Sequence, residues 1–157
     1  MIANISEETG NFLFSLIKNM KCKSILEIGT GEGFSTKFLA KSNGNVITIE
    51  ISKNRYEKAR ENLKEFKNIK LIKGDALKVL PKVKKKFDFI FIDASKNNYL
   101  NFLKLIEENN LMKNNCIIAA DNVVSHEERV KDYLDYTRKN YKSKFVNIGK
   151  GLEISFK

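Results

Sequence analysis

The sequence predicts an α/β fold. The expected sheet is doubly wound, Rossmann-like and seven-stranded, mostly parallel with a C-terminal antiparallel hairpin, and it carries helices on both faces. Two observations predict it. Short apolar runs alternate with helical patterns along the chain, which is typical of successive βα units. The last two runs, 144–148 and 152–156, are joined only by Gly149-Lys150-Gly151, which indicates a hairpin.

The first half of the chain contains two apolar runs, each followed by a helical pattern. Leu13, Leu16 and Ile17 recur at helical spacing in the first helix, which we expect to cover the sheet or the mouth of a ligand site, and Tyr56 and Ala59 do so in a later one. In order, the expected elements are a helix over 6–20, a strand over 24–28, a helix over 34–41, a strand over 46–50 and a helix that includes 56–63.

The second half continues the alternation. Residues 87–93 are nearly all apolar and end in a carboxylate, as expected for a central parallel strand. Ser125 and Glu128 have the spacing of a capping box and predict the start of the last helix. The expected elements are a strand over 69–73, a short helix that ends near Pro81, the strand over 87–93, a helix over 99–108, a strand over 116–120, the last helix with Val130 and Leu134, and the hairpin.

A glycine motif follows the first strand and predicts a nucleotide-like cofactor. Gly29, Gly31 and Gly33 alternate with other residues where a buried strand must turn into a helix, and glycine permits the positive φ and close backbone approach that such a turn needs. Glu50 ends the next strand, twenty-one residues after Gly29, where a carboxylate can accept hydrogen bonds from both ribose hydroxyls.

The spacing of the glycines distinguishes between two cofactor classes. Dinucleotide sites have the pattern G-x-G-x-x-G, whereas Gly29, Gly31 and Gly33 follow G-x-G-x-G. Glu27, two residues earlier, would repel a pyrophosphate but could engage an amino-bearing ligand through backbone and water. We therefore favour S-adenosylmethionine over a dinucleotide, and a glycine-rich turn without a ligand remains the simplest alternative.

Polar residues also follow the other predicted strands. In doubly wound sheets ligands bind beyond the carboxyl ends of the strands, so these residues should meet at one edge of the sheet. Each one alone is more often a helix cap or turn former. Together, Asp93, Asp121 and Asn122 supply three hard oxygen ligands of the kind that Mg²⁺ prefers.

Length and composition limit the class of protein. The chain has 157 residues and no linker or repeat, so we expect one domain over 1–157. It has no apolar stretch long enough for a bilayer, and we expect a soluble, cytoplasmic protein without a membrane partner. The net charge of +10 raises the possibility of an RNA partner, but 25 Lys against 4 Arg is equally typical of a solvated surface.

Several motifs together resemble one enzyme family. The segments 26–35, 49–50, 74–76, 87–96 with Tyr99, 120–122 and 151–155 are similar, in order, to those of the metal-dependent O-methyltransferases of the catechol and caffeoyl-CoA type. These are S-adenosylmethionine enzymes of the seven-stranded, Rossmann-like class. The resemblance runs from about residue 9 to the C-terminus, and the Asp-x-x-Lys and Asp-Asn elements are more specific to the family than the glycine motif is.

The resemblance implies a role for each matching residue. Lys96 would act as general base on the acceptor hydroxyl, beside Asp93, and Asp93, Asp121 and Asn122 would hold Mg²⁺ or another divalent cation. The implied reaction is methyl transfer by in-line displacement from sulfonium to oxygen. The implied cofactor-binding residues are Glu27, Gly29, Thr30, Gly31, Gly33, Phe34, Ser35, Glu50, Ile51, Asp75, Ala76 and Asp93, with Ser35 on the cofactor carboxylate, Glu50 on the ribose and Asp75 and Ala76 beside the adenine.

The chain also departs from the family pattern, which leaves the acceptor open. It lacks most of the N-terminal helices that usually cover the acceptor pocket, the segment 123–128 is short, and Lys150 stands where the family usually has Asp. A small hydroxyl acceptor, enclosed with the help of a second subunit in a homodimer, is the favoured reading. RNA, in particular tRNA, is the alternative acceptor. An NAD-dependent oxidoreductase and a non-catalytic cofactor-binding module fit the motifs less well.

Overall fold

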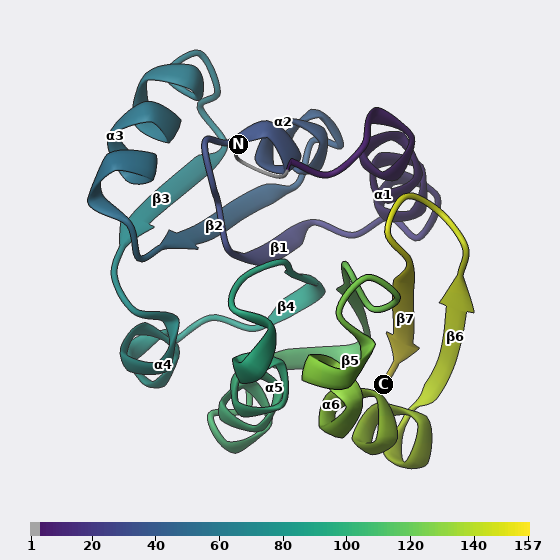
Figure 1. Ribbon diagram of the computed structural model, residues 1–157. Coiled ribbons are helices and arrows are strands. Elements are labelled where there is room, and N and C mark those ends of the chain that lie inside the picture. The colour runs from purple at the N-terminus through teal and green to yellow at the C-terminus, as the bar shows by residue number, and fades with distance from the viewer. Residues whose placement is uncertain (1–3) are drawn as a thin grey trace.

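The computed structural model describes residues 4–157 and contains one seven-stranded sheet, in the order β3-β2-β1-β4-β5-β7-β6 (Figure 1). The strands are β1 (Ser24–Ile28), β2 (Asn45–Glu50), β3 (Ile69–Lys73), β4 (Phe87–Ile92), β5 (Met112–Ala120), β6 (Lys142–Val146) and β7 (Leu152–Phe156). The helices are α1 (Glu7–Asn19), α2 (Phe34–Lys41), α3 (Lys53–Asn62), α4 (Ala76–Val79), α5 (Tyr99–Glu108) and α6 (Glu127–Asn140), with short 3₁₀ turns η1 (Leu80–Lys82) and η2 (Lys96–Asn98).

The sheet has the predicted mixture of parallel and antiparallel pairs. Strands β1 to β5 pair in parallel, and β7 pairs antiparallel with both β5 and β6. The strand order reverses between β1 and β4, so the carboxyl ends of these two neighbouring strands form the switch point at which doubly wound sheets bind ligands. The predicted fold class is confirmed.

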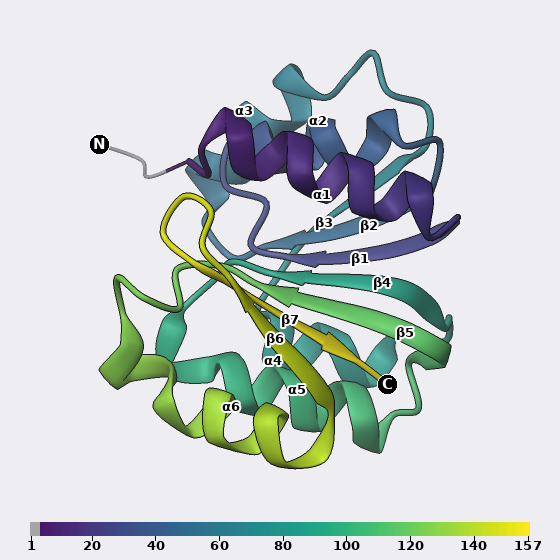
Figure 2. The ribbon, with the colours of Figure 1, turned by 90° about the vertical axis from the view of Figure 1, so that its right-hand side faces the viewer.

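Side chains from alternate positions of the strands build two separate cores. Ile25, Phe89 and Ile117 lie in register across β1, β4 and β5 and pack against α1 and α2. Leu26 and Ile90, one position further along, pack instead with α5 and α6. Figure 2 shows the resulting layers, with α1, α2 and α3 on one side of the sheet and α4, α5 and α6 on the other. This burial on both faces explains why the central strands read as continuous apolar runs.

Two predicted strands and the predicted start of one helix differ from the structure. Strand β5 begins at Met112, four residues before the expected start at Cys116, because the exposed stretch 113–115 lacks the apolar pattern of a strand. Strand β6 ends at Val146 and not at Ile148, since the turn begins two residues earlier. The capping box is absent: helix α6 has His126 at its N-cap without a side-chain hydrogen bond, and the Ser125 hydroxyl contacts Asn122 and His126 instead.

The starts of α1 and α3 follow ordinary capping rules. Ser6 caps α1 by accepting a hydrogen bond from the Thr9 N–H at 3.0 Å, and Glu7 and Glu8 lie in the first turn, where acids stabilise the helix dipole. Ser52 caps α3 through the Arg55 N–H. Within residues 4–157 no helix is long and apolar enough to cross a membrane.

One backbone contact fixes the glycine turn against the next strand of the sheet. Gly29 has φ +99°, and a Cβ placed on it would lie 2.1 Å from the carbonyl oxygen of Asp93. The Asp93 N–H in turn donates to the Ile28 carbonyl at 2.9 Å. The ends of β1 and β4 can therefore approach only when residue 29 lacks a side chain.

This contact predicts opposite outcomes for two glycines. Gly29→Ala should reduce the free energy of unfolding by more than about 3 kcal/mol, or prevent folding, because a methyl group has no space against Asp93. Gly31→Ala is the matched control: its Cβ would meet nothing within 4 Å, and at φ +59° it should cost only about 1–2 kcal/mol. Urea denaturation of both variants measures the difference, and equal losses would contradict the close approach.

Candidate active site

A cavity of about 540 Å³ opens at the carboxyl ends of β1, β2, β3 and β4. This volume lies within the range of small-molecule sites. The structure brings ten of the expected cofactor residues to its walls: Gly29, Thr30, Gly31, Phe34, Ser35, Glu50, Ile51, Asp75, Ala76 and Asp93. Asn4, Ile5, Arg55 and Phe102 also line it. They were missed because they follow no motif and reach the cavity only through the fold.

The glycines of the turn have separate roles. Gly31 leaves open space where a side chain would project, and it lines the cavity. Gly33 does not line it. A Cβ on Gly33 would lie 2.9 Å from Leu63, so this glycine lets α3 pack against the start of α2. Gly33 therefore has a packing role, and its contact with the cofactor stays a prediction.

Glu27, another predicted cofactor residue, also lies outside the cavity walls. Its side chain is fully buried in β1, and its carboxyl accepts hydrogen bonds from the hydroxyls of Ser35 at 2.5 Å, Thr36 at 2.6 Å and Thr48 at 2.6 Å. Burial raises its pKa from 4.5 to about 7, although these hydroxyls partly offset the effect. Glu27 thus ties the start of α2 to β1 and β2 from beneath the glycine turn.

The same network limits what Ser35 can do. Ser35 lines the cavity, but its hydroxyl hydrogen is directed to Glu27. A cofactor carboxylate needs a donor, so the expected side-chain contact of Ser35 with that group is not available in this arrangement. A neighbouring backbone N–H at the start of α2 is the alternative donor.

Glu50 and Asp75 point their carboxylates at backbone near the cavity. Glu50 is 3% exposed and accepts from the Gly31 N–H and the Ser52 N–H, both at 2.8 Å. It therefore holds the glycine turn against the end of β2. Asp75 accepts from the Leu77 N–H at 3.0 Å and caps α4. Both residues still line the cavity, and their remaining lone pairs can accept further hydrogen bonds.

At one end of the cavity, four polar side chains form a connected cluster. The Lys96 ammonium donates to Asp93 Oδ1 at 2.9 Å. The Asn122 amide nitrogen donates to the same oxygen at 2.9 Å and to Asp121 Oδ2 at 2.8 Å. Asp93 and Lys96 line the cavity, whereas Asp121 and Asn122 lie behind them. The predicted catalytic and metal residues are therefore brought together.

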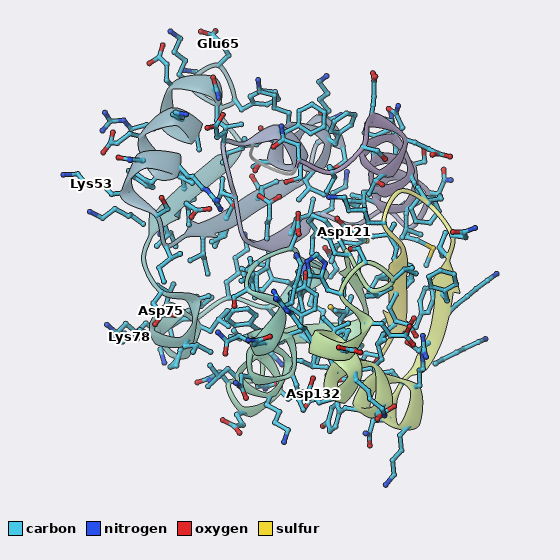
Figure 3. All side chains as sticks on the ribbon, in the orientation of Figure 1. Lys53, Glu65, Asp75, Lys78, Asp121 and Asp132 are labelled. Carbon is cyan, nitrogen blue, oxygen red and sulfur yellow. The ribbon has the colours of Figure 1, made fainter. Side chains whose placement is uncertain are left out.

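Asp121 is the most deeply buried carboxylate of this cluster. Figure 3 shows it well inside the outline of the molecule, whereas Lys53, Glu65 and Lys78 reach the edge. Desolvation, followed by repulsion from Asp93, raises its pKa from 3.8 to about 6. Its Oδ1 atom is buried and has no hydrogen-bond partner among residues 4–157.

These features fit a divalent cation. Two adjacent carboxylates, one of them with an unsatisfied buried oxygen, and an amide that can present its oxygen after a half-turn are hard ligands for Mg²⁺. In the described part of the chain no cluster contains three His, Cys, Asp or Glu side chains placed for a metal, so a cation here would need Asn122 as its third ligand. Asn122 itself has φ +63°, in the left-handed region that asparagine adopts more readily than most residues.

Comparison with known proteins identifies the family of the chain. The model of a family described as O-methyltransferase matches residues 1–153. The chain belongs to the O-methyltransferase family. A relative from Arabidopsis thaliana, provisionally named a caffeoyl-CoA O-methyltransferase, is 32% identical over 96% of this chain and 71% of its own length. The predicted family and enzyme class, methyltransferase, are confirmed.

Solved structures of O-methyltransferases share the fold. A Staphylococcus aureus protein, provisionally named a caffeoyl-CoA O-methyltransferase, is 30% identical with a TM-score of 0.91, over 99% of this chain and 86% of that one. The Bacillus cereus O-methyltransferase in complex with S-adenosylhomocysteine (SAH) is 25% identical with a TM-score of 0.86, over 98% and 82%. Against seven other curated O-methyltransferases of the catechol and caffeoyl-CoA type, the chain spans 53% to 58% of their length.

The buried Glu27 predicts a specific dependence of stability on pH. Because its pKa is raised from 4.5 to about 7 by folding, the unfolded chain releases this proton first as the pH rises. The contribution of Glu27 to the free energy of unfolding should therefore fall between about pH 4.5 and 7, by up to about 3 kcal/mol. Glu27→Gln cannot titrate and should lack this fall.

Urea denaturation at pH 5 and pH 8 measures the effect. The stability of Glu27→Gln relative to the unchanged protein should increase from the lower to the higher pH. Glu65→Gln, at an exposed position, is the control and should give the same difference at both values. A Glu27→Gln variant that tracks the control would mean that Glu27 is already charged in the fold.

Proposed function

We propose that this protein transfers the methyl group of S-adenosylmethionine to a hydroxyl of a small, catechol-like acceptor, with the assistance of a divalent cation. The observation that carries the proposal is the position of Asp93. Its side chain lines the cofactor-sized cavity and also contacts Lys96 and Asn122. Asp93 therefore lies between the cavity and the polar cluster. A reaction beside Asp93 would have the cofactor on one side and the metal and general base on the other.

The cavity would hold the cofactor along the ends of the central strands. The backbone at Gly31 lies under the open space where a methionine group would sit, and Glu50 has lone pairs available for the ribose hydroxyls. Asp75 and Ala76 would flank the adenine, and exposed Ile51 would cover it. The Bacillus cereus relative in complex with SAH supports this choice of cofactor.

Asp93, Asp121 and Asn122 would hold the cation. When bound, the cofactor supplies an electrophilic methyl group and the metal makes an acceptor hydroxyl more acidic and orients it. The unsatisfied Oδ1 atom of Asp121 supports this role, because a buried carboxylate oxygen without a partner is costly in the absence of a cation.

Lys96 would accept the proton of the acceptor hydroxyl. Its side chain is only 14% exposed and its ammonium donates to Asp93. A cation bound at the same carboxylate disfavours the charged form of a lysine. A lysine can act as a base only in its neutral form. The ring of Tyr99, 5.3 Å from the nitrogen, restricts the directions that Lys96 can take.

The acceptor would be a small molecule, and a second subunit would complete its enclosure. RNA is the second candidate, because lysines give the chain its net charge of +10 and much of that charge is exposed. Against RNA, Lys96 and Asp93 are 14% and 15% exposed, which suits a small hydroxyl better than a nucleotide held in a polymer. We also propose a single domain and a cytoplasmic location.

The metal role predicts separate effects on binding and on chemistry. Asp121→Ala should reduce methyl transfer to catechol by more than about 100-fold. Removal of a metal ligand should cost more activity than removal of a side chain that only hydrogen-bonds to a ligand. SAH should still bind with a similar affinity, in the micromolar range, because Asp121 does not line the cavity. Chelation with EDTA should abolish turnover, and Mg²⁺ or Mn²⁺ should restore it.

Asp132→Ala is the control for that experiment, since Asp132 is an exposed carboxylate on α6 (Figure 3). Its turnover should match that of the unchanged protein. Full activity of Asp121→Ala, or full activity in EDTA, would refute the metal site.

The choice of acceptor predicts the form of the protein in solution. A protein that methylates catechol should behave as a homodimer in light scattering, because one chain leaves the site open. Binding of tRNA, measured by fluorescence anisotropy, should be weak and should fall steeply between about 50 and 200 mM salt without methyl incorporation. Methylation of tRNA by a monomer would favour the RNA alternative.

A further inference from the structure

The hairpin between β6 and β7 carries Lys150 to the edge of the proposed metal site. The Val124 N–H donates to the Lys150 carbonyl and the Val123 N–H donates to the Gly151 carbonyl, both at 3.2 Å. Val123 directly follows Asn122, one of the proposed metal ligands. The backbone at Lys150 is therefore attached to the same loop that supplies Asp121 and Asn122.

The other side of the hairpin tip is fixed as well. Gly149 has φ +58°, and a Cβ placed on it would lie 2.5 Å from Thr9 Oγ1 and 3.2 Å from Ser6 Oγ. The tip is thus packed against the start of α1, as Figure 2 also shows. Held between α1 and the loop after β5, the backbone at Lys150 keeps a defined position relative to the site.

The charge of Lys150 is exposed and unpaired. Among the residues that the structure describes, no carboxylate lies within 4 Å of the nitrogens of Lys150 or Arg129, whereas Lys96 is paired with Asp93. Desolvation raises the pKa of Asp121, and Lys150 is among the groups that partly offset this increase. The pKa of His126 is lowered by desolvation and then by Lys96, Arg129 and Lys150. Lys150 is therefore an exposed cation without an ion-pair partner among the described residues, beside the loop that carries Asp121 and Asn122.

An apolar surface lies beside Lys150. Val124 is 56% exposed and Phe145 is 41% exposed, and they are two of the four large exposed apolar side chains of residues 4–157. They lie together, because a Cβ on Gly151 would be 2.7 Å from Val124 and 3.0 Å from Phe145. An aromatic ring could pack against this pair while an anionic substituent reaches the lysine.

We propose that Lys150 binds a carboxylate of the methyl acceptor, so that the acceptor is an aromatic vicinal diol that also carries an acidic group. This inference rests on the proposed function and adds the chemical class of its substrate. Lys150 would be a specificity-determining residue that acts on acceptor binding. The groups proposed for the chemical step remain Lys96, as the general base, and the proposed metal ligands.

Two acceptors of nearly equal shape test the proposal. The probes are 3,4-dihydroxybenzoate, which is anionic, and 3,4-dihydroxybenzyl alcohol, which is neutral. The unchanged protein should methylate the benzoate with a kcat/KM about 5- to 10-fold higher, mainly through KM. Lys150→Ala should remove this preference, and Lys150→Glu should reverse it.

Lys142→Glu is the matched control. It makes the same change of charge on an exposed residue of β6, next to Phe156 and so at the opposite end of the hairpin from Lys150. It should retain the preference for the benzoate. Thermal unfolding of each variant verifies that the fold is intact.

The outcomes separate this inference from the proposed function. Equal methylation of both diols by the unchanged protein would overturn the role of Lys150 and leave the methyltransferase proposal standing. If neither diol is methylated although SAH binds, the proposed small-molecule function fails for diols. Calorimetric titration of 3,4-dihydroxybenzoate in the presence of SAH and Mg²⁺ then tests whether Lys150 binds the carboxylate. Binding that Lys150→Glu weakens and Lys142→Glu does not would support this role. Absence of binding would overturn it.

Discussion

The geometry of the candidate active site depends on the contact between the backbone of Gly29 and the carbonyl oxygen of Asp93. A side chain at residue 29 would lie 2.1 Å from that oxygen, so the contact requires glycine. It brings the turn after β1, which borders the cavity, against the end of β4, which carries Asp93 and Lys96. Beneath this turn, Glu27 binds three hydroxyls from α2 and β2, and above it Glu50 binds the Gly31 N–H. A preorganised site of this kind needs little rearrangement on binding.

Asp93 couples the two halves of the site. Its Oδ1 atom accepts hydrogen bonds from both Lys96 and Asn122. A cation that takes this oxygen would displace at least one of these donors, so a bound metal would change the hydrogen bonds of Lys96 and Asn122. The pKa of Asp121 is raised first by desolvation and then by repulsion from Asp93. A divalent cation would relieve the repulsion that the protein alone leaves.

The sequence predicted the sheet well because its central strands are buried on both faces and read as apolar runs. It also predicted which residues meet at the cavity, since parallel strands place their carboxyl ends at one edge. It could not distinguish a carboxylate that faces the ligand from one that faces the protein. Glu27 and Gly33 stand within the motif, yet one binds hydroxyls and the other packs against Leu63. Asn4 and Arg55 reach the cavity only through the packing of α1 and α3, which no local pattern encodes.

The central claim is that cofactor and metal occupy adjoining parts of one site, joined by Asp93. Nuclear relaxation of S-adenosylmethionine labelled with ¹³C at the transferable methyl group, measured with Mn²⁺ bound to the protein, tests it most directly. We expect a strong enhancement of relaxation of the methyl carbon that excess Mg²⁺ removes and that is absent in Asp121→Ala. A bound cofactor whose methyl carbon relaxes at the same rate with and without Mn²⁺ would contradict the shared site.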